Sequence, residues 1–242
     1  MRLSRSATER LFAGTAGFAH RGRHGPGIPE NSLAAFRAAI ADGAGIECDL
    51  RLSCDGFAVI VHDSSLERMW GLPVETEATK AAALLALPLA GTDQHIPWLG
   101  ALLELAGETT PLLLELKTRA GDPPSPVDLL CRTVAGDLAG HPGPVGVMSF
   151  DPRVGAWFAR HVPAIPRGLV IADATPAWRR FAMLGVARPT FIAVETSAGP
   201  RPWVAKVRQR WPVACWTVRD AKQKQALSDR VDALIWEGDG RP

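Results

Sequence analysis

The chain has 242 residues, 47% of them hydrophobic, and 27 basic residues nearly balance 25 acidic ones for a net charge of +2. Such a length is enough for one globular domain with a sizeable core, and the small net charge argues against a broad nucleic-acid-binding face. The four cysteines form no Cys-x-x-Cys pair, which argues against a zinc site or a disulfide framework.

The N-terminus has a superficial likeness to an export signal. Several arginines precede an apolar run from Leu11 to Ala19, but Glu9 interrupts the basic region. Cleavage after the run would also destroy the strand expected before His20. No other apolar run approaches the roughly 20 residues that a membrane span needs. We therefore expect a cytoplasmic protein with reduced thiols, no export signal and no transmembrane segment, folded as a single domain over residues 1–242.

The first quarter of the chain predicts two strands with a helix between them and a hairpin after them. A short apolar run before a glycine-rich loop predicts the first strand, and alternating side chains predict the second. Asn31 or Ser32 caps the intervening helix. An Asp55-Gly56 turn signal predicts a strand that returns along the second. These elements are strands Ala16–His20, Ile46–Leu52 and Phe57–His62, with a helix that ends near Asp42.

The rest of the chain alternates between helical and strand patterns. Predicted helices are Thr79–Leu87, Trp98–Ala106, Val127–Ala139, Pro152–Arg160, Pro176–Leu184, Pro202–Gln209 and Ala221–Leu227. Predicted strands are Leu112–Lys117, Val145–Phe150, Leu169–Ala172, Phe191–Glu195, Val213–Val218 and Ala233–Trp236. About eight such units favour an α/β fold whose parallel sheet closes into a barrel. A dinucleotide-binding fold lacks its signature, because no Gly-x-Gly-x-x-Gly follows the first strand.

Carboxylates gather where chemistry is expected in such a barrel, at the carboxyl ends of its strands. Glu47 and Asp49 are two residues apart on one strand, so they share a face while Cys48 points toward the core. Glu115 and Lys117 repeat this arrangement on a later strand. Crowded carboxylates repel one another unless a cation lies among them, and an all-oxygen set suits Mg²⁺, Ca²⁺ or Mn²⁺. We predict that Glu47, Asp49 and Glu115 bind one divalent cation.

The alternative is that Glu47 and Asp49 are charges on an edge strand, paired with Arg51 and Lys117. Such pairs are common, and an isolated Glu-x-Asp favours this interpretation. The agreement of several strand ends in one chain favours the metal site instead.

Two histidines, His20 and His62, end strands beside the carboxylates. Histidine gives and takes protons near neutral pH, so one can deprotonate an attacking oxygen while the other protonates a leaving alkoxide. A single histidine at a strand end is usually a surface residue, but two of them flank the cluster here. Arg21 and Lys117 supply fixed positive charge for phosphate oxygens. The pattern therefore predicts cleavage of a phosphodiester.

Further residues are candidates for the wall of a substrate pocket. Asn31 is equally suited to the site and to capping the helix that begins beside it, where N–H groups favour an anion. Trp216 is suited to a pocket wall or to the core. The candidate pocket residues are Glu30, Asn31, Ser149, Phe150, Glu195 and Trp216.

These residues resemble the glycerophosphodiester phosphodiesterase family, and the resemblance covers nearly the whole chain. His-Arg-Gly, Pro-Glu-Asn, Glu-x-Asp and His-Asp occur in that order in its first half. The matching stretches are AHRG (Ala19–Gly22), PENSLAAF (Pro29–Phe36), IECDLRLSCDGFAVIVHD (Ile46–Asp63), IPWL (Ile96–Leu99), LLLELK (Leu112–Lys117), SF (Ser149–Phe150) and ACWTV (Ala214–Val218).

The resemblance implies a TIM-type (β/α)8 barrel that binds Mg²⁺ or Ca²⁺ and acts in lipid and glycerol metabolism. Such an enzyme releases an alcohol from a glycerophosphodiester and leaves glycerol 3-phosphate, and a neighbouring glycerol hydroxyl can attack first to give a cyclic phosphate. The implied metal ligands are Glu47, Asp49 and Glu115, the acid/base pair is His20 and His62, and the phosphate contacts are Arg21 and Lys117.

Three departures from the family pattern affect the expected substrate pocket. Trp98 stands where a small threonine is usual, and Trp236-Glu237-Gly238-Asp239 replaces the usual Thr/Ser-Asp. The segment after Asp63 is short, so the insertion after the second strand is minimal. Two alternatives therefore stay open. One is a lysophospholipase D or sphingolipid-type phosphodiesterase, with Trp70, Trp98 and Trp203 as candidates for an apolar surface; the other is a non-catalytic barrel that binds a phosphorylated small molecule.

Overall fold

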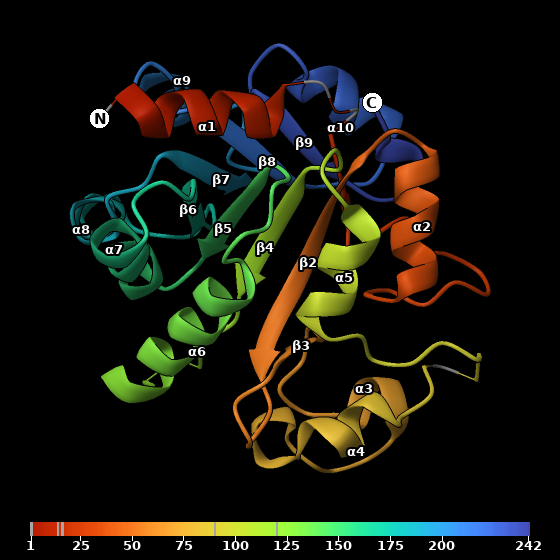
Figure 1. The fold of residues 1–242 in the computed structure, drawn as a ribbon. Coiled ribbons are helices and arrows are strands. Elements are labelled where there is room, and N and C mark those ends of the chain that lie inside the picture. Colours follow the sequence, from red (N-terminus) through yellow and green to blue (C-terminus); the bar gives the residue numbers. More distant parts are fainter. Residues whose placement is uncertain (1, 14, 16, 90, 120) are drawn as a thin grey trace.

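The computed structural model describes residues 2–13, 15, 17–89, 91–119 and 121–242. Within them, eight parallel strands form a closed barrel that helices surround (Figure 1). β1 pairs with β2 on one side and with β9 on the other, which closes the ring. The TIM-type barrel is therefore confirmed. Its strands are β1 (Phe18–His20), β2 (Gly45–Leu52), β4 (Leu112–Leu116), β5 (Val145–Ser149), β6 (Arg167–Ile171), β7 (Phe191–Glu195), β8 (Val213–Val218) and β9 (Ala233–Trp236).

The helices follow the strands in the order that the sequence predicts. The outer helices are α2 (Leu33–Ala41), α5 (Leu99–Ala106), α6 (Pro124–Asp137), α7 (Pro152–His161), α8 (Ala177–Ala187), α9 (Pro202–Arg208) and α10 (Ala221–Leu227), and a 3-10 turn, η2 (Gly238–Gly240), follows β9. α6 begins three residues before the predicted start because Pro124 is tolerated in the first turn of a helix. Ala16, which the sequence assigned to the first strand, lies outside the described residues.

Side-chain alternation along β2 divides the interior into two layers. Ile46, Cys48 and Leu50 are fully buried in the apolar layer between strands and helices, as expected for one face of the strand. The intervening Glu47 and Asp49 are equally buried but belong to the other face, inside the barrel. Burial of charge on that face is costly, so the barrel interior near the strand ends must contain compensating groups.

The amino-terminal end of the barrel is closed by α1 (Arg2–Phe12), a helix that the sequence did not predict (Figure 1). Leu11 is fully buried, and it occupies the space beside Gly146, where an added Cβ would lie 2.5 Å from the Leu11 side chain. Phe12 packs edge-on against Phe18 and Phe191. Part of the apolar run that resembled an export signal, Leu11 and Phe12, therefore packs against the amino-terminal end of the barrel.

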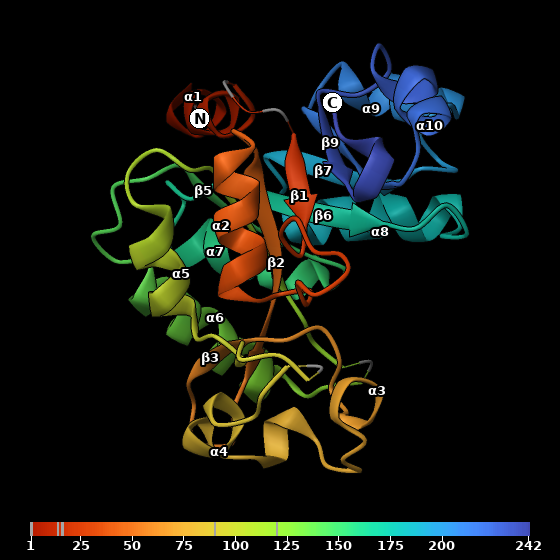
Figure 2. The same ribbon diagram turned by 90° about the vertical axis from the view of Figure 1, so that its right-hand side faces the viewer.

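An insertion after β2 forms a small lobe at the opposite end (Figures 1 and 2). β3 (Ala58–Ile60) pairs antiparallel with β2 outside the ring, and α3 (Glu67–Trp70), η1 (Thr76–Ala78) and α4 (Ala81–Leu85) follow. The lobe buries its own apolar cluster of Val59, Val61, Leu66, Leu84, Leu89 and Ile96. The predicted minimal insertion is confirmed. In the described part of the chain, no helix has both the length and the apolar character required to cross a membrane.

Candidate active site

Three buried carboxylates meet inside the carboxyl end of the barrel. Glu47, Asp49 and Glu115 each offer one oxygen, and these oxygens all lie within 4.8 Å of one another. The register of β2 and β4 aligns Asp49 with Glu115. The sequence prediction that the three side chains share a face is therefore confirmed.

In the described part of the chain, two buried carboxylate oxygens of this cluster accept no hydrogen bond: Glu47 Oε1 and Asp49 Oδ1, the latter 3.0 Å from the ammonium group of Lys117. Glu47 Oε2 accepts a hydrogen bond from the backbone N–H of Arg21 at 3.0 Å, whereas Glu47 Oε1 is buried and has no hydrogen-bond partner in the described part of the chain. Asp49 Oδ2 accepts from Asn31 Nδ2 at 2.9 Å. A buried carboxylate oxygen that accepts no hydrogen bond is stabilised by a cation or a proton, and three carboxylates form the all-oxygen set that hard divalent cations prefer. The residues thus fit a divalent cation.

Burial and mutual repulsion separate the pKa values of these carboxyl groups. Burial, followed by the nearby charge of Asp49, raises the pKa of Glu47 to about 7. Burial would also raise the pKa of Asp49, but the cations of Lys117 and Arg21 hold it well below its usual range. Burial raises the pKa of Glu115 despite a Lys117 Nζ–Glu115 Oε1 distance of 2.6 Å. The local cations thus do not remove the penalty on ionising all three groups.

Lys117 is the cation nearest to the carboxylates of β2 and β4. Its Nζ lies 3.0 Å from Asp49 Oδ1 as well as close to Glu115. Part of the charge-pair alternative is therefore observed, since Lys117 does pair with Asp49. The edge-strand part is wrong because β2 lies within the closed ring, and Arg51 pairs instead with Glu77 at 2.6 Å.

His20 lies between the acidic cluster and the last residues of the chain. Its Nε2 is 3.9 Å from Glu47 Oε2, and its Nδ1 is 2.5 Å from Glu237 Oε1. Burial alone would lower the pKa of His20, but Glu47 and Glu237 raise it above its ordinary value. Glu237 is not among the site residues that the sequence predicts. Its position directly after β9, within a departure from the family pattern, was the signal that could have identified it.

His62 lies at the edge of the insertion and has a different environment. Its Nδ1 is 2.7 Å from Asp63 Oδ1, and Asp63 also pairs with Arg68. Burial, together with the charges of Lys117 and Arg21, lowers the pKa of His62. The pKa values of the two histidines are therefore displaced in opposite directions, upward for His20 and downward for His62.

The loop after β1 brings Arg21, Glu30 and Asn31 to the same site. Arg21 Nη1 lies 2.9 Å from Glu30 Oε1, and its Nε lies 3.2 Å from Asp49 Oδ2. Asn31 is buried and faces Asp49, whereas Ser32 caps α2 by accepting a hydrogen bond from the backbone of Ala35. The ambiguity between site and cap is thus resolved, because Asn31 turns to the site.

The remaining candidate pocket residues lie on or next to β5, β7 and β8, and they make two different kinds of contact. Ser149 Oγ donates to the carbonyl oxygen of Leu116 at 2.7 Å, and Glu195 Oε2 accepts from the backbone N–H of Asp173 at 3.0 Å. Both side chains are thereby held to the backbone. Phe150 and Trp216 instead pack edge-on with ring centroids 5.4 Å apart, so these two form an aromatic wall.

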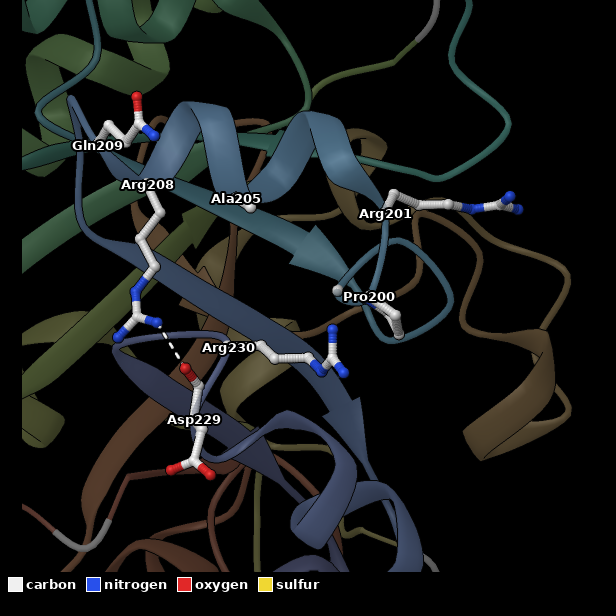
Figure 3. A pocket seen from close by; sticks show the side chains of 8 residues that line it. Pro200, Arg201, Ala205, Arg208, Gln209, Asp229 and Arg230 are labelled. Atoms are coloured by element: carbon white, nitrogen blue, oxygen red, sulfur yellow. Dashed lines mark hydrogen bonds between the residues drawn. The ribbon is translucent and has the colours of Figure 1, made fainter.

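Two surface hollows help to delimit the site. One of about 330 Å³ lies beside α9, with Arg208 hydrogen-bonded to the carbonyl oxygen of Asp229 at 2.7 Å (Figure 3). It contains none of the histidines or clustered carboxylates described above. A second hollow of about 170 Å³ is bordered by Lys117, Thr118 and Glu77. We therefore place the candidate site at the barrel mouth, next to the second hollow.

Known proteins resemble this chain in sequence and in fold. The family model described as "Glycerophosphoryl diester phosphodiesterase family" matches residues 20–237. A glycerophosphodiester phosphodiesterase from Caldanaerobacter subterraneus is 47% identical over 51 residues, which are 21% of each chain. This chain thus aligns with only about a fifth of the length of such curated relatives.

Solved structures align over most of their length. A glycerophosphodiester phosphodiesterase from Thermotoga maritima is 23% identical with a TM-score of 0.76, covering 92% of this chain and 94% of that one. An Oleispira antarctica phosphodiesterase, solved in complex with the product sn-glycerol-3-phosphate, is 24% identical with a TM-score of 0.77, covering 93% and 92%. These likenesses show a common fold. With the family match across nearly the whole chain, the protein belongs to the glycerophosphoryl diester phosphodiesterase family.

Proposed function

We propose that this protein hydrolyses a glycerophosphodiester to an alcohol and glycerol 3-phosphate, using one divalent cation and two histidines. The observation that carries the proposal is the buried set of Glu47, Asp49 and Glu115, with His20 beside Glu47 and His62 near enough to Asp49 to interact with its charge. The family match supports the substrate class, and the Oleispira antarctica relative was solved with the product expected here.

The three carboxylates would hold the cation, with Mg²⁺ or Ca²⁺ favoured and Mn²⁺ also compatible. Once bound, the ion would supply positive charge that stabilises the charge developing on the phosphate during attack. The unpartnered Glu47 Oε1 supports this assignment because that atom lacks a counterpart in the described part of the chain.

The histidines move protons on either side of the phosphate. One takes the proton of the attacking glycerol hydroxyl, and the other gives a proton to the leaving alkoxide, so that the alcohol departs and a cyclic phosphate forms. Water then opens the cyclic phosphate to glycerol 3-phosphate, with the two histidines in reversed roles. Glu237 holds the His20 ring through Nδ1, and Asp63 holds the His62 ring through the corresponding atom. Each imidazole therefore presents its Nε2 to the substrate.

The fixed cations and the aromatic wall bind the rest of the substrate. Arg21 and Lys117 contact phosphate oxygens, while Asn31 and Glu30 hold Asp49 and Arg21 in place. The alcohol portion lies against the wall of Phe150 and Trp216. The substrate is a small molecule, and the chain acts as a single domain over residues 1–242. The exposed, unpaired thiol of Cys54 supports a reducing, cytoplasmic location.

The test measures hydrolysis of glycerophosphocholine after chelation and after return of each metal. We expect activity to require the metal. Glu47→Ala should abolish both turnover and stabilisation by the ion, whereas His62→Ala should abolish turnover but keep the stabilisation. Saturating metal should raise the melting temperature of the wild type by about 5–10 °C, from about 2.7 kcal/mol of binding free energy at a hundred times Kd.

The same assay with lysophosphatidylcholine separates the lipid-cleaving alternative, and a binding titration without turnover would identify the non-catalytic one. Wild-type rates in both variants would contradict the proposal.

A further inference from the structure

Helix α8 presents an apolar stripe to solvent rather than to the barrel. Trp178 and Phe181 are 74% and 82% exposed, and Ala182, Gly185 and Val186 on the same helix are also exposed. These positions are spaced at i, i+3, i+4, i+7 and i+8, so they form one continuous face. We call these five residues the α8 stripe.

The inner face of α8 already packs against the hydrophobic core, so the α8 stripe is a second apolar face and not the face that the core buries. Ala187 is buried against Gly155 of α7, where an added Cβ would lie 2.6 Å from the Ala187 carbonyl oxygen. Met183 and Leu184 are partly buried against the same apolar layer. Figures 1 and 2 both show α8 on the outer flank of the barrel, away from the insertion. The helix thus has two apolar faces, one of which has no partner in the described part of the chain.

Positive charge surrounds the α8 stripe. Residues 151–202 contain seven arginines but only three acidic residues, an excess of four positive charges in a chain whose net charge is +2. Arg179 lies on α8 itself, Arg188 ends it, and Arg160 lies on the adjacent α7. None of these three guanidinium groups forms a salt bridge with the acidic side chains that the structure describes. Their charge is therefore available to an external anion.

We propose that the α8 stripe and its arginines dock on an anionic phospholipid surface. Exposed aromatic rings beside arginines are typical of helices that lie in the interface of a membrane, with the rings among the acyl chains and the cations among the headgroups. A second copy of this chain is a less favourable partner for the α8 stripe. Symmetric pairing would bring the arginines beside the stripe of one copy close to those of the other, and like charges repel.

The surface differs from the one that the sequence suggested. Trp203 lies under the guanidinium group of Arg180, 4.4 Å from the ring centre, and Trp70 donates a hydrogen bond to the carbonyl oxygen of Pro88. Both rings are half-buried, and Trp98 alone of that set is well exposed, at 46%. Trp178 was not among the candidates, because helical spacing alone does not distinguish an outward stripe from a buried one.

Docking through the α8 stripe would bring the barrel mouth near the lipid surface. α8 follows the carboxyl end of β6, so Trp178 in its first turn lies on the same end of the barrel as the acidic cluster. The docking inference does not depend on catalysis, and its test measures binding without turnover.

The experiment is co-sedimentation of the full chain with phosphatidylcholine vesicles that contain or lack phosphatidylglycerol. We expect wild-type protein to bind the anionic vesicles and added salt to weaken binding. Trp178→Ala combined with Phe181→Ala should weaken binding at least tenfold. Arg160→Gln combined with Arg179→Gln should weaken it about 25-fold, from about fivefold for each arginine. Phe57→Ala is the matched control, because Phe57 is 52% exposed on the β2–β3 turn and should leave binding within about twofold.

Thermal melting would establish that each variant is folded. The proposal is overturned if wild-type protein does not bind the anionic vesicles, or if the variant with both Trp178→Ala and Phe181→Ala binds them as tightly as wild type. It is also overturned if sedimentation shows a wild-type dimer that this variant converts to a monomer without any vesicle binding, because the α8 stripe would then be an interface between copies.

Discussion

The two halves of the barrel mouth differ in their side chains, because one half is charged and the other is aromatic. The ends of β1, β2 and β4, joined by the residue after β9, carry the charged cluster of His20, Glu47, Asp49, Glu115 and Glu237. The ends of β5 and β8 carry the aromatic wall of Phe150 and Trp216. Glu115 and Glu195 show the contrast, since both lie at strand ends but only Glu115 joins the cluster.

This difference teaches that position at a strand end is not enough to make a site residue. Glu115 is 6% exposed and lies beside Asp49 and Lys117, so its charge must be balanced by its neighbours. Glu195 satisfies a backbone N–H in the loop after β6 and needs no further partner. We therefore infer that the charged half supplies the chemistry and the aromatic half shapes the pocket.

The largest effect is expected from removing one carboxylate charge in the charged half. Glu115→Gln should reduce kcat/KM at least 10³-fold and abolish stabilisation by metal, because the ion loses a charged ligand. Glu195→Gln makes the same chemical change in the other half and should leave activity within about twofold. Kinetics with glycerophosphocholine and melting with metal check both variants. Equal losses in the two would remove the distinction between the halves.

A smaller loss, about 10²-fold in kcat/KM, is expected for Lys117→Met, which removes the proposed phosphate contact. Without the ammonium group, Asp49 and Glu115 lose a buried counter-charge, so the metal-free protein should be destabilised by about 3 kcal/mol. Metal should then raise the melting temperature more than it does in the wild type. A smaller gain would show that Lys117 helps to hold the ion rather than competing with it for the carboxylates.

A moderate effect, about tenfold on kcat with little change in KM, is expected for Glu237→Gln. The amide keeps a hydrogen-bond acceptor for His20 but lacks the charge that stabilises its imidazolium form. Arg219→Gln is the control, since Arg219 contacts the other oxygen of Glu237 at 3.0 Å without touching His20. A change in KM alone in the Glu237 variant would argue against a positioning role.

The smallest effect is expected in the aromatic half. Trp216→Ala should raise KM about five- to tenfold and leave kcat within about threefold, because the wall binds substrate and transition state alike. Trp216→Phe should recover most of the affinity. A loss in kcat comparable to that of Glu237→Gln would show that the aromatic half takes part in the chemistry.

Much of the fold was predictable because its patterns are local. The alternation of strand and helix predicted the barrel, and β7, β8, α10 and β9 have the predicted bounds. α1 was not predicted, since the burial of Leu11 depends on Phe191 and Gly146, far away in the sequence. The direction of the Asn31 side chain was likewise ambiguous until Ser32 was seen to cap α2.

The sequence by itself determined which residues could do chemistry. The two-residue spacing of Glu47 and Asp49 forces them onto one face of a strand, whatever else the chain does. Only the tertiary structure decided which residues would meet. His20 and Glu237 are 217 positions apart and touch because β9 closes the ring against β1, and no local pattern reports a contact that depends on closure.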